Sequence, residues 1–190
     1  EDRACRDISD SECREAPRNF TLNAANGTAT KFAEQLASPD LTLPWMLEAV
    51  GAPVAITGLL VPLRRAGSLL PQLAASGRIR TLPVRKHVWV GAAVVQTITL
   101  LVMALAVAFL SGVAAGVTVA AMLAVFSVAS GIASVSYKDV LAKTIPKGRR
   151  GRLLAVRSTV GGAFTLAAGL VLFLVVREAS TRLPYVVLVA

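Results

Sequence analysis

Long apolar stretches separated by short, strongly charged segments form the main pattern of this chain. No Asp, Glu, Lys or Arg occurs from residue 87 to residue 137. A helix needs about 20 apolar residues to cross a hydrocarbon core of about 30 Å, so this stretch is long enough for two crossings and a tight turn. We therefore predict membrane spans at about residues 88–110 and 113–137, with the turn at Ser111-Gly112.

Two further apolar segments follow the basic region around residue 150. Residues 158–176 contain no charge and predict another span, and residues 183–190 begin the next, with Pro184 suited to a first helical turn. The chain begins with Glu1 rather than Met and ends inside the apolar run 186–189. We therefore expect it to be a piece of a longer protein, cut within a span.

The region before residue 80 allows two divisions. One places a single span at 41–63 and a surface amphipathic helix at 19–37. The other makes a polar first span of about 20–50, a turn at 51–53 and a second span of about 54–76. The second division puts charges inside spans: Lys31, Glu34, Glu48, Arg64 and Arg65. A central charge costs about 2.5–3.5 kcal/mol unless it faces water or an opposite charge.

Composition excludes a water-soluble globule, because 55% of residues are hydrophobic and 16% are charged, against about 25% in soluble domains. The net charge of +9 does not indicate nucleic acid, since the basic residues lie between apolar stretches. They gather in 78–86 and 138–157, whereas the opposite side holds only Arg177 and Arg182. The positive-inside rule then places both basic loops in the cytoplasm. The polar leader, residues 1–18, is cytoplasmic under the second division and external under the first.

Motifs for covalent chemistry are scarce. His87 is the only histidine, which excludes most histidine-based metal sites and catalytic triads. We expect Cys5 and Cys13 to be free thiols, and we expect no metal, no cofactor and no enzymatic activity.

The segment 131–169 resembles the stretch that joins the fourth and fifth helices in the major facilitator superfamily of secondary transporters. The cytoplasmic motif is supplied by Pro146, Arg149, Arg150, Gly151 and Arg152. A glycine-rich fifth span follows, with Gly161, Gly162 and Gly169. The acidic residue of the superfamily's loop after the second helix is missing near 76–80, and so is an arginine in the middle of the fourth span. Both departures argue against the sugar and proton-antiport drug branches.

The resemblance implies an all-α polytopic membrane protein, the N-terminal half of a twelve-helix bundle, with the missing C-terminal half as its partner in the same chain. It also implies a bacterial cytoplasmic (inner) membrane, with the N-terminus in the cytoplasm. The expected function is secondary active transport of a small solute or ion by alternating access. The rival interpretation is a non-transporting membrane subunit or partner-binding protein, and a membrane-embedded enzyme is a weaker third.

Polar residues of the first span recur every three or four positions, which gathers them on one side of a helix. With Arg64 they are the predicted substrate or ion pathway: Asn23, Asn26, Thr30, Lys31, Glu34 and Arg64. The alternatives are a surface helix or a structural Lys31–Glu34 pair. Arg64 also suits an anionic group or a pair with Glu48. It points about 100° away from Arg65 on a helix, so at most one of the two faces a cavity.

A second charged group lies at the predicted cytoplasmic face. The resemblance implies that it acts as a conformational latch, which breaks when the two halves of the transporter rock; its members are Lys138, Asp139, Arg149, Arg150 and Arg152. The alternative is that these charges only set topology and attract anionic lipid. Gln96 is expected to hydrogen-bond between helices, and the glycines of the later spans to permit close helix packing.

Overall fold

The computed structural model describes residues 8–79 and 86–178, and every regular element in these ranges is an α-helix. The all-α prediction is therefore confirmed. The helices are α1 (Asp10–Leu36), α2 (Thr42–Ala49), α3 (Val54–Ile79), α4 (Lys86–Phe109), α5 (Gly112–Thr144) and α6 (Lys147–Glu178).

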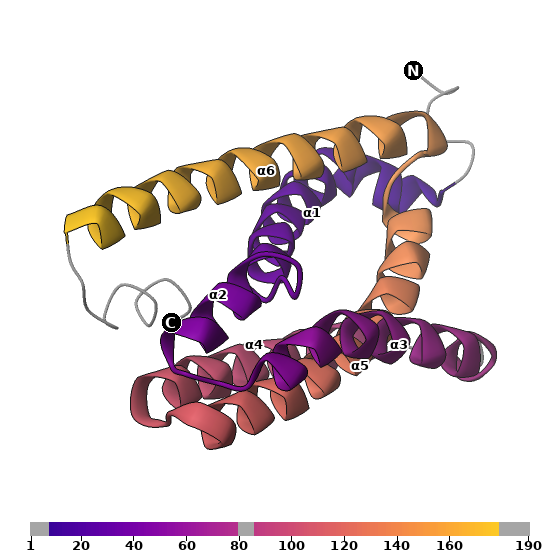
Figure 1. Cartoon of the computed structure of the whole chain (residues 1–190). Coiled ribbons are helices and arrows are strands. Elements are labelled where there is room, and N and C mark those ends of the chain that lie inside the picture. The colour runs from indigo at the N-terminus through magenta and orange to yellow at the C-terminus, as the bar shows by residue number, and fades with distance from the viewer. Residues whose placement is uncertain (1–7, 80–85, 179–190) are drawn as a thin grey trace.

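The helices form two groups that α5 connects (Figure 1). In one group, α5 packs along both α3 and α4, and in the other α1 packs along α6. The last turns of α5 rise from the first group to meet the start of α6 (Figure 1). This arrangement brings α1, α4, α5 and α6 around one interior space.

Three helices in the described ranges are long and apolar enough to cross a membrane: His87–Phe109, Gly112–Thr144 and Lys147–Val171. They overlap the spans predicted at 88–110, 113–137 and 158–176. Together they support an integral membrane protein. The spans predicted at 20–50 and 54–76 carry charges and are not among the three. The segment 183–190 lies outside the described residues.

The predicted first span is two helices rather than one. α1 ends at Leu36 and α2 begins at Thr42, with Pro39 in the break. Proline has no backbone N–H and disfavours a helical conformation at the residue before it. The Thr42 hydroxyl donates to the Gln35 carbonyl oxygen at 2.9 Å, so a hydrogen bond connects α2 to the end of α1 across the break.

Helices extend further into the charged segments than the sequence analysis predicted. α1 begins at Asp10, inside the polar leader, with Asp10 and Glu12 in its first turn, where acidic groups interact favourably with the helix dipole. The predicted basic loop 138–157 is mostly helix, broken only where Ile145 is extended before Pro146. Charge keeps a segment out of lipid without preventing it from being helical.

Two predicted turns lie together at one end of the helices. Gly51 and Gly112 both adopt positive φ, at 72° and 59°, which glycine reaches without steric cost. The Gly112 amide donates to the Val50 carbonyl oxygen at 2.8 Å, so the 50–53 and 110–112 connections share one face of the molecule. The α5–α6 connection lies at the other end of α5.

Two apolar clusters form the core. The larger one is built from α2, α3, α4 and α5 and includes the fully buried Leu47, Met103 and Phe126. The smaller one joins Leu141, Ile145 and Leu153 at the α5–α6 junction, with Phe20 and Tyr137 packed against it. A polar region separates the two clusters.

Candidate functional site: a polar cavity among four helices

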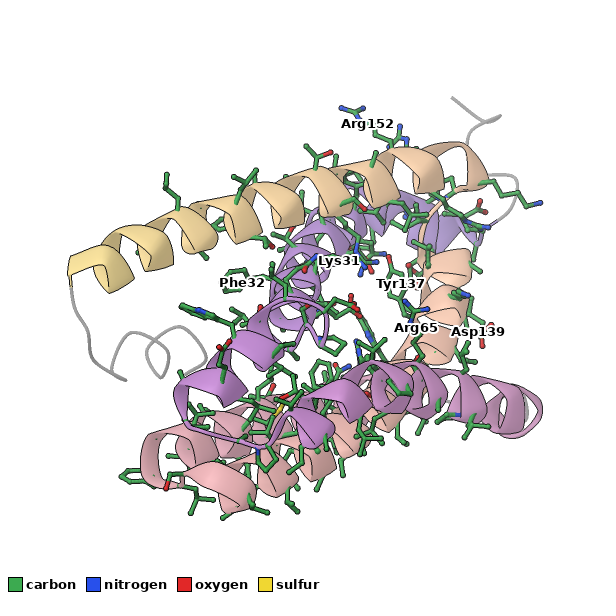
Figure 2. The ribbon with its side chains drawn as sticks, viewed as in Figure 1. Lys31, Phe32, Arg65, Tyr137, Asp139 and Arg152 are labelled. Atoms are coloured by element: carbon green, nitrogen blue, oxygen red, sulfur yellow. The ribbon has the colours of Figure 1, made fainter. Side chains whose placement is uncertain are left out.

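A cavity of about 270 Å³ lies among α1, α4, α5 and α6. Most of its lining residues are polar or charged, and Figure 2 shows Lys31 and Tyr137 in the space between α1, α5 and α6. The polar and charged lining residues are Asn26, Thr30, Lys31, Glu34, Gln96, Ser130, Ser134, Lys138, Arg157 and Ser158, with the aromatic Trp89 and Tyr137.

Four of the five predicted pathway residues of α1 line this cavity: Asn26, Thr30, Lys31 and Glu34. The helical spacing of these residues correctly indicated a common polar face. The fifth, Asn23, is buried outside the lining, and its amide donates to the Asn19 carbonyl oxygen at 2.7 Å. Its Oδ1 has no hydrogen-bond partner among the described residues.

Glu34 is the centre of the charged contacts. Its carboxylate lies 3.0 Å from the Lys31 ammonium and 4.0 Å from the Arg64 guanidinium. The Ser130 hydroxyl donates to the same carboxylate at 3.4 Å and thereby ties α5 to α1. Glu34 thus joins groups from three helices.

Arg64 reaches this group from α3. Its guanidinium donates to the Ser130 hydroxyl at 3.4 Å and lies 4.7 Å from the centre of the Phe126 ring. It pairs with Glu34 rather than with Glu48, which is exposed. Arg65 is exposed, as expected if only one of the two arginines faces the interior.

Arg157 is the main residue that the sequence analysis missed. The sequence pattern places it in a basic cytoplasmic loop, but in the structure it is buried, with 9% of its surface exposed. Its guanidinium lies 4.1 Å from the centre of the Tyr137 ring. The sequence feature that could have indicated an interior position is that Arg157 lies four residues before Gly161, so both lie on one face of α6.

Tyr137 links the aromatic part of the lining. Its ring centre lies 5.7 Å from that of Trp89 on α4, and the same ring contacts Arg157 on α6. Tyr137 of α5 therefore contacts both neighbouring helices. The sequence analysis predicted no role for either aromatic residue. Gln96, expected to hydrogen-bond across helices, is one of the cavity-lining residues of α4.

The predicted latch residues are distributed over the end of α5 and the start of α6. Lys138 lines the cavity, whereas Arg152 and Asp139 lie on the outer sides of α6 and α5 (Figure 2). Arg150 donates to the carbonyl oxygens of Ala142 and Ile145 at 2.8 and 2.9 Å, so it caps the end of α5. Arg149 is exposed. A latch function of these charges stays a prediction.

The described residues contain no group of three or more His, Cys, Asp and Glu side chains that could hold a metal ion. Cys13 is bonded in a disulfide, so the expected free thiol is wrong at this position. Cys5 lies outside the described residues.

In comparisons with known proteins, no family model, no curated protein and no solved structure matches the chain.

Proposed function

We propose that this chain is part of a secondary active transporter that moves a small solute across a membrane by alternating access. The observation that carries the proposal is the polar cavity, which places Lys31, Glu34 and Arg157 between α1 and three helices that are long and apolar enough to cross a membrane. Ionisable side chains within a membrane are costly and are typically found where a solute or ion passes. A purely structural bundle has no need of such a cavity.

The position of the cavity supports this function. It lies between the larger apolar cluster, which closes the end near Gly51 and Gly112, and the smaller cluster at the α5–α6 junction. Transporters bind substrate near the bilayer midplane and open it alternately to each side. Such a cycle requires a polar site with an apolar region on each side of it, and the two clusters have these positions.

The helix pairing supports the proposed likeness to half of a major-facilitator bundle. Such a half is built from two inverted repeats of three spans, so that the first span corresponds to the fourth and the second to the fifth. If α1 and α2 together form the first span, then α3, α5 and α6 are the second, fourth and fifth spans. The repeat then relates the contact of the second span with the fourth (α3 with α5) to the contact of the fifth span with the first (α6 with α1). Both pairings are present.

The basic segments favour a cytoplasmic position for the α5–α6 connection and the N-terminus, by the positive-inside rule. The disulfide at Cys13 is a bond typical of oxidising compartments, and it favours the opposite orientation. We propose the cytoplasmic orientation, in a bacterial inner membrane, because two basic segments favour it and one disulfide opposes it.

Cysteine labelling of the full-length protein in membrane vesicles tests the proposal. Ser134→Cys on α5, in a background without Cys5 and Cys13, should react with a membrane-impermeant maleimide in both right-side-out and inside-out vesicles. Val128→Cys lies on the same helix and is 40% exposed on the apolar exterior, so lipid should protect it. Labelling of Ser134→Cys from one side only would contradict alternating access and favour a non-transporting subunit.

A further inference from the structure

The charges of the polar cavity do not cancel. Lys31, Lys138 and Arg157 line it as cations, and Glu34 is the one acidic residue of its lining. Glu34 is already engaged, because its carboxylate contacts Lys31 at 3.0 Å and Arg64 at 4.0 Å. The cavity therefore carries a surplus of positive charge, and Arg157 is its most buried cation.

Arg157 is held in place without an acidic partner. Its guanidinium carbon lies over the Tyr137 ring, 4.1 Å from the ring centre, and the five N–H donors of the group leave it able to bind a further partner. Gly27 on α1 makes room for it, since a Cβ atom there would collide with the guanidinium. Among the described residues Arg157 forms no ion pair.

A buried cation without a counter-charge is unfavourable in a membrane, and a bound anion removes that cost. The planar guanidinium matches the paired oxygens of a carboxylate or a phosphate. We propose that the cavity binds a small solute through a carboxylate or phosphate group, with Arg157 as the main ligand and Lys31 as the second cation. This inference rests on the proposed function and names the substrate class.

The rest of the lining suits the remainder of such a solute. Asn26, Thr30 and Ser134 offer neutral hydrogen-bonding groups, and Trp89 offers an apolar wall. The volume of about 270 Å³ is slightly below the range of about 300–1,000 Å³ typical of pockets for drug-sized ligands. The solute is therefore small.

Thermal unfolding of the full-length protein in detergent tests the inference. Sodium phosphate and sodium succinate are added in separate titrations at an ionic strength held constant with sodium chloride, and glycerol is the neutral control. At least one anion should raise Tm with increasing concentration, as a ligand of the native state does. The two titrations distinguish phosphate from carboxylate. Stabilisation by glycerol alone, or by none of the three, would overturn the inference.

Variants assign the effect to the cavity. Arg157→Gln should weaken the apparent affinity about tenfold or more, because it removes a charge-assisted contact, and Arg157→Lys should weaken it less. Lys143→Gln is the matched control, since Lys143 is exposed on α5 outside the cavity. If Arg157→Gln does not fold, Lys31→Gln gives the same readout at a side chain that is half exposed. Anion affinities equal to wild type in these cavity variants would overturn the inference.

The binding and labelling results separate the two proposals. Anion binding that depends on Arg157, with Ser134→Cys labelled from one side only, refutes transport and leaves the anion site in place. Labelling from both sides without anion binding refutes the anion site and leaves transport in place.

Discussion

A few charged residues connect α1 to the neighbouring helices. Glu34 carries the compensating negative charge for Lys31 and Arg64, and Arg64 in turn stacks on Phe126 of α5. Arg157 repeats this arrangement from α6, with its guanidinium on Tyr137 of the same helix α5. Two arginines from different helices are thus positioned by aromatic rings of α5, and within the described ranges only Arg64 has a carboxylate partner.

Replacing Glu34 tests this arrangement. Glu34→Gln leaves Lys31 and the mostly buried Arg64 without a counter-charge, so we expect the free energy of unfolding to fall by about 1–3 kcal/mol. Denaturant titration in mixed micelles measures the change. Glu48→Gln is the matched control, because Glu48 is exposed, and it should shift the value by less than about 0.5 kcal/mol. Equal effects of both variants would contradict the assignment of Glu34 as the partner of Arg64.

Pairs of helices approach closely where one of them carries a glycine at the contact. At the α3–α5 contact, a Cβ atom on Gly67 would lie 2.8 Å from the Ser127 Cβ, and one on Gly131 would collide with the Ser68 backbone. At the α1–α6 contact, Gly27 faces Arg157 and Gly161 faces Lys31. Each interface thus places glycine on both helices. Gly162 and Gly169, predicted to serve the same purpose, have no neighbour within 4 Å among the described residues.

The α3–α5 contact predicts a position-dependent effect of alanine. Gly131→Ala should lower the free energy of unfolding by about 1–3 kcal/mol, because its Cβ would meet backbone atoms of Ser68, which yield less easily than a side chain. Gly91→Ala on α4 has no atom within 4 Å and should stabilise by up to about 1 kcal/mol through helix propensity. The same micelle titration reports both. Destabilisation by Gly91→Ala, or none by Gly131→Ala, would contradict the packing.

Across the whole molecule, the sequence predicted the helical class, the turns at Gly51 and Gly112, and the polar face of α1. Apolar runs and three-to-four spacing carry this information, because they follow directly from helix geometry. Helix ends and the role of Arg157 were not predictable in the same way. Charge alone does not separate a loop from a helix, and the burial of one arginine depends on a ring and a glycine from two other helices.

The pairing of Arg64 with Glu34 was not predictable from the sequence either. Arg64 lies far from Glu34 in the chain but 4.0 Å from it in space, whereas the nearer Glu48 is exposed. Glu48 lies in the last turn of α2, beside the turn at Gly51, whereas Arg64 lies well inside α3. Long-range pairing of this kind follows from the packing of the complete set of helices.

The central claim is that α1 lies among the other helices with its polar face against α6, rather than on the membrane surface. Oxidative cross-linking in native membranes tests it with Lys31→Cys and Gly161→Cys in a background without Cys5 and Cys13. A Cβ at position 161 would lie 2.8 Å from the Lys31 Cβ, closer than the separation of about 3.5–4.5 Å in a disulfide, so a slight outward shift of α6 brings this pair to bonding geometry and a disulfide should form. Lys31→Cys with Gly169→Cys, about 12 Å further along α6, should not. Failure of the first pair to link, or equal linking of both pairs, would contradict the account.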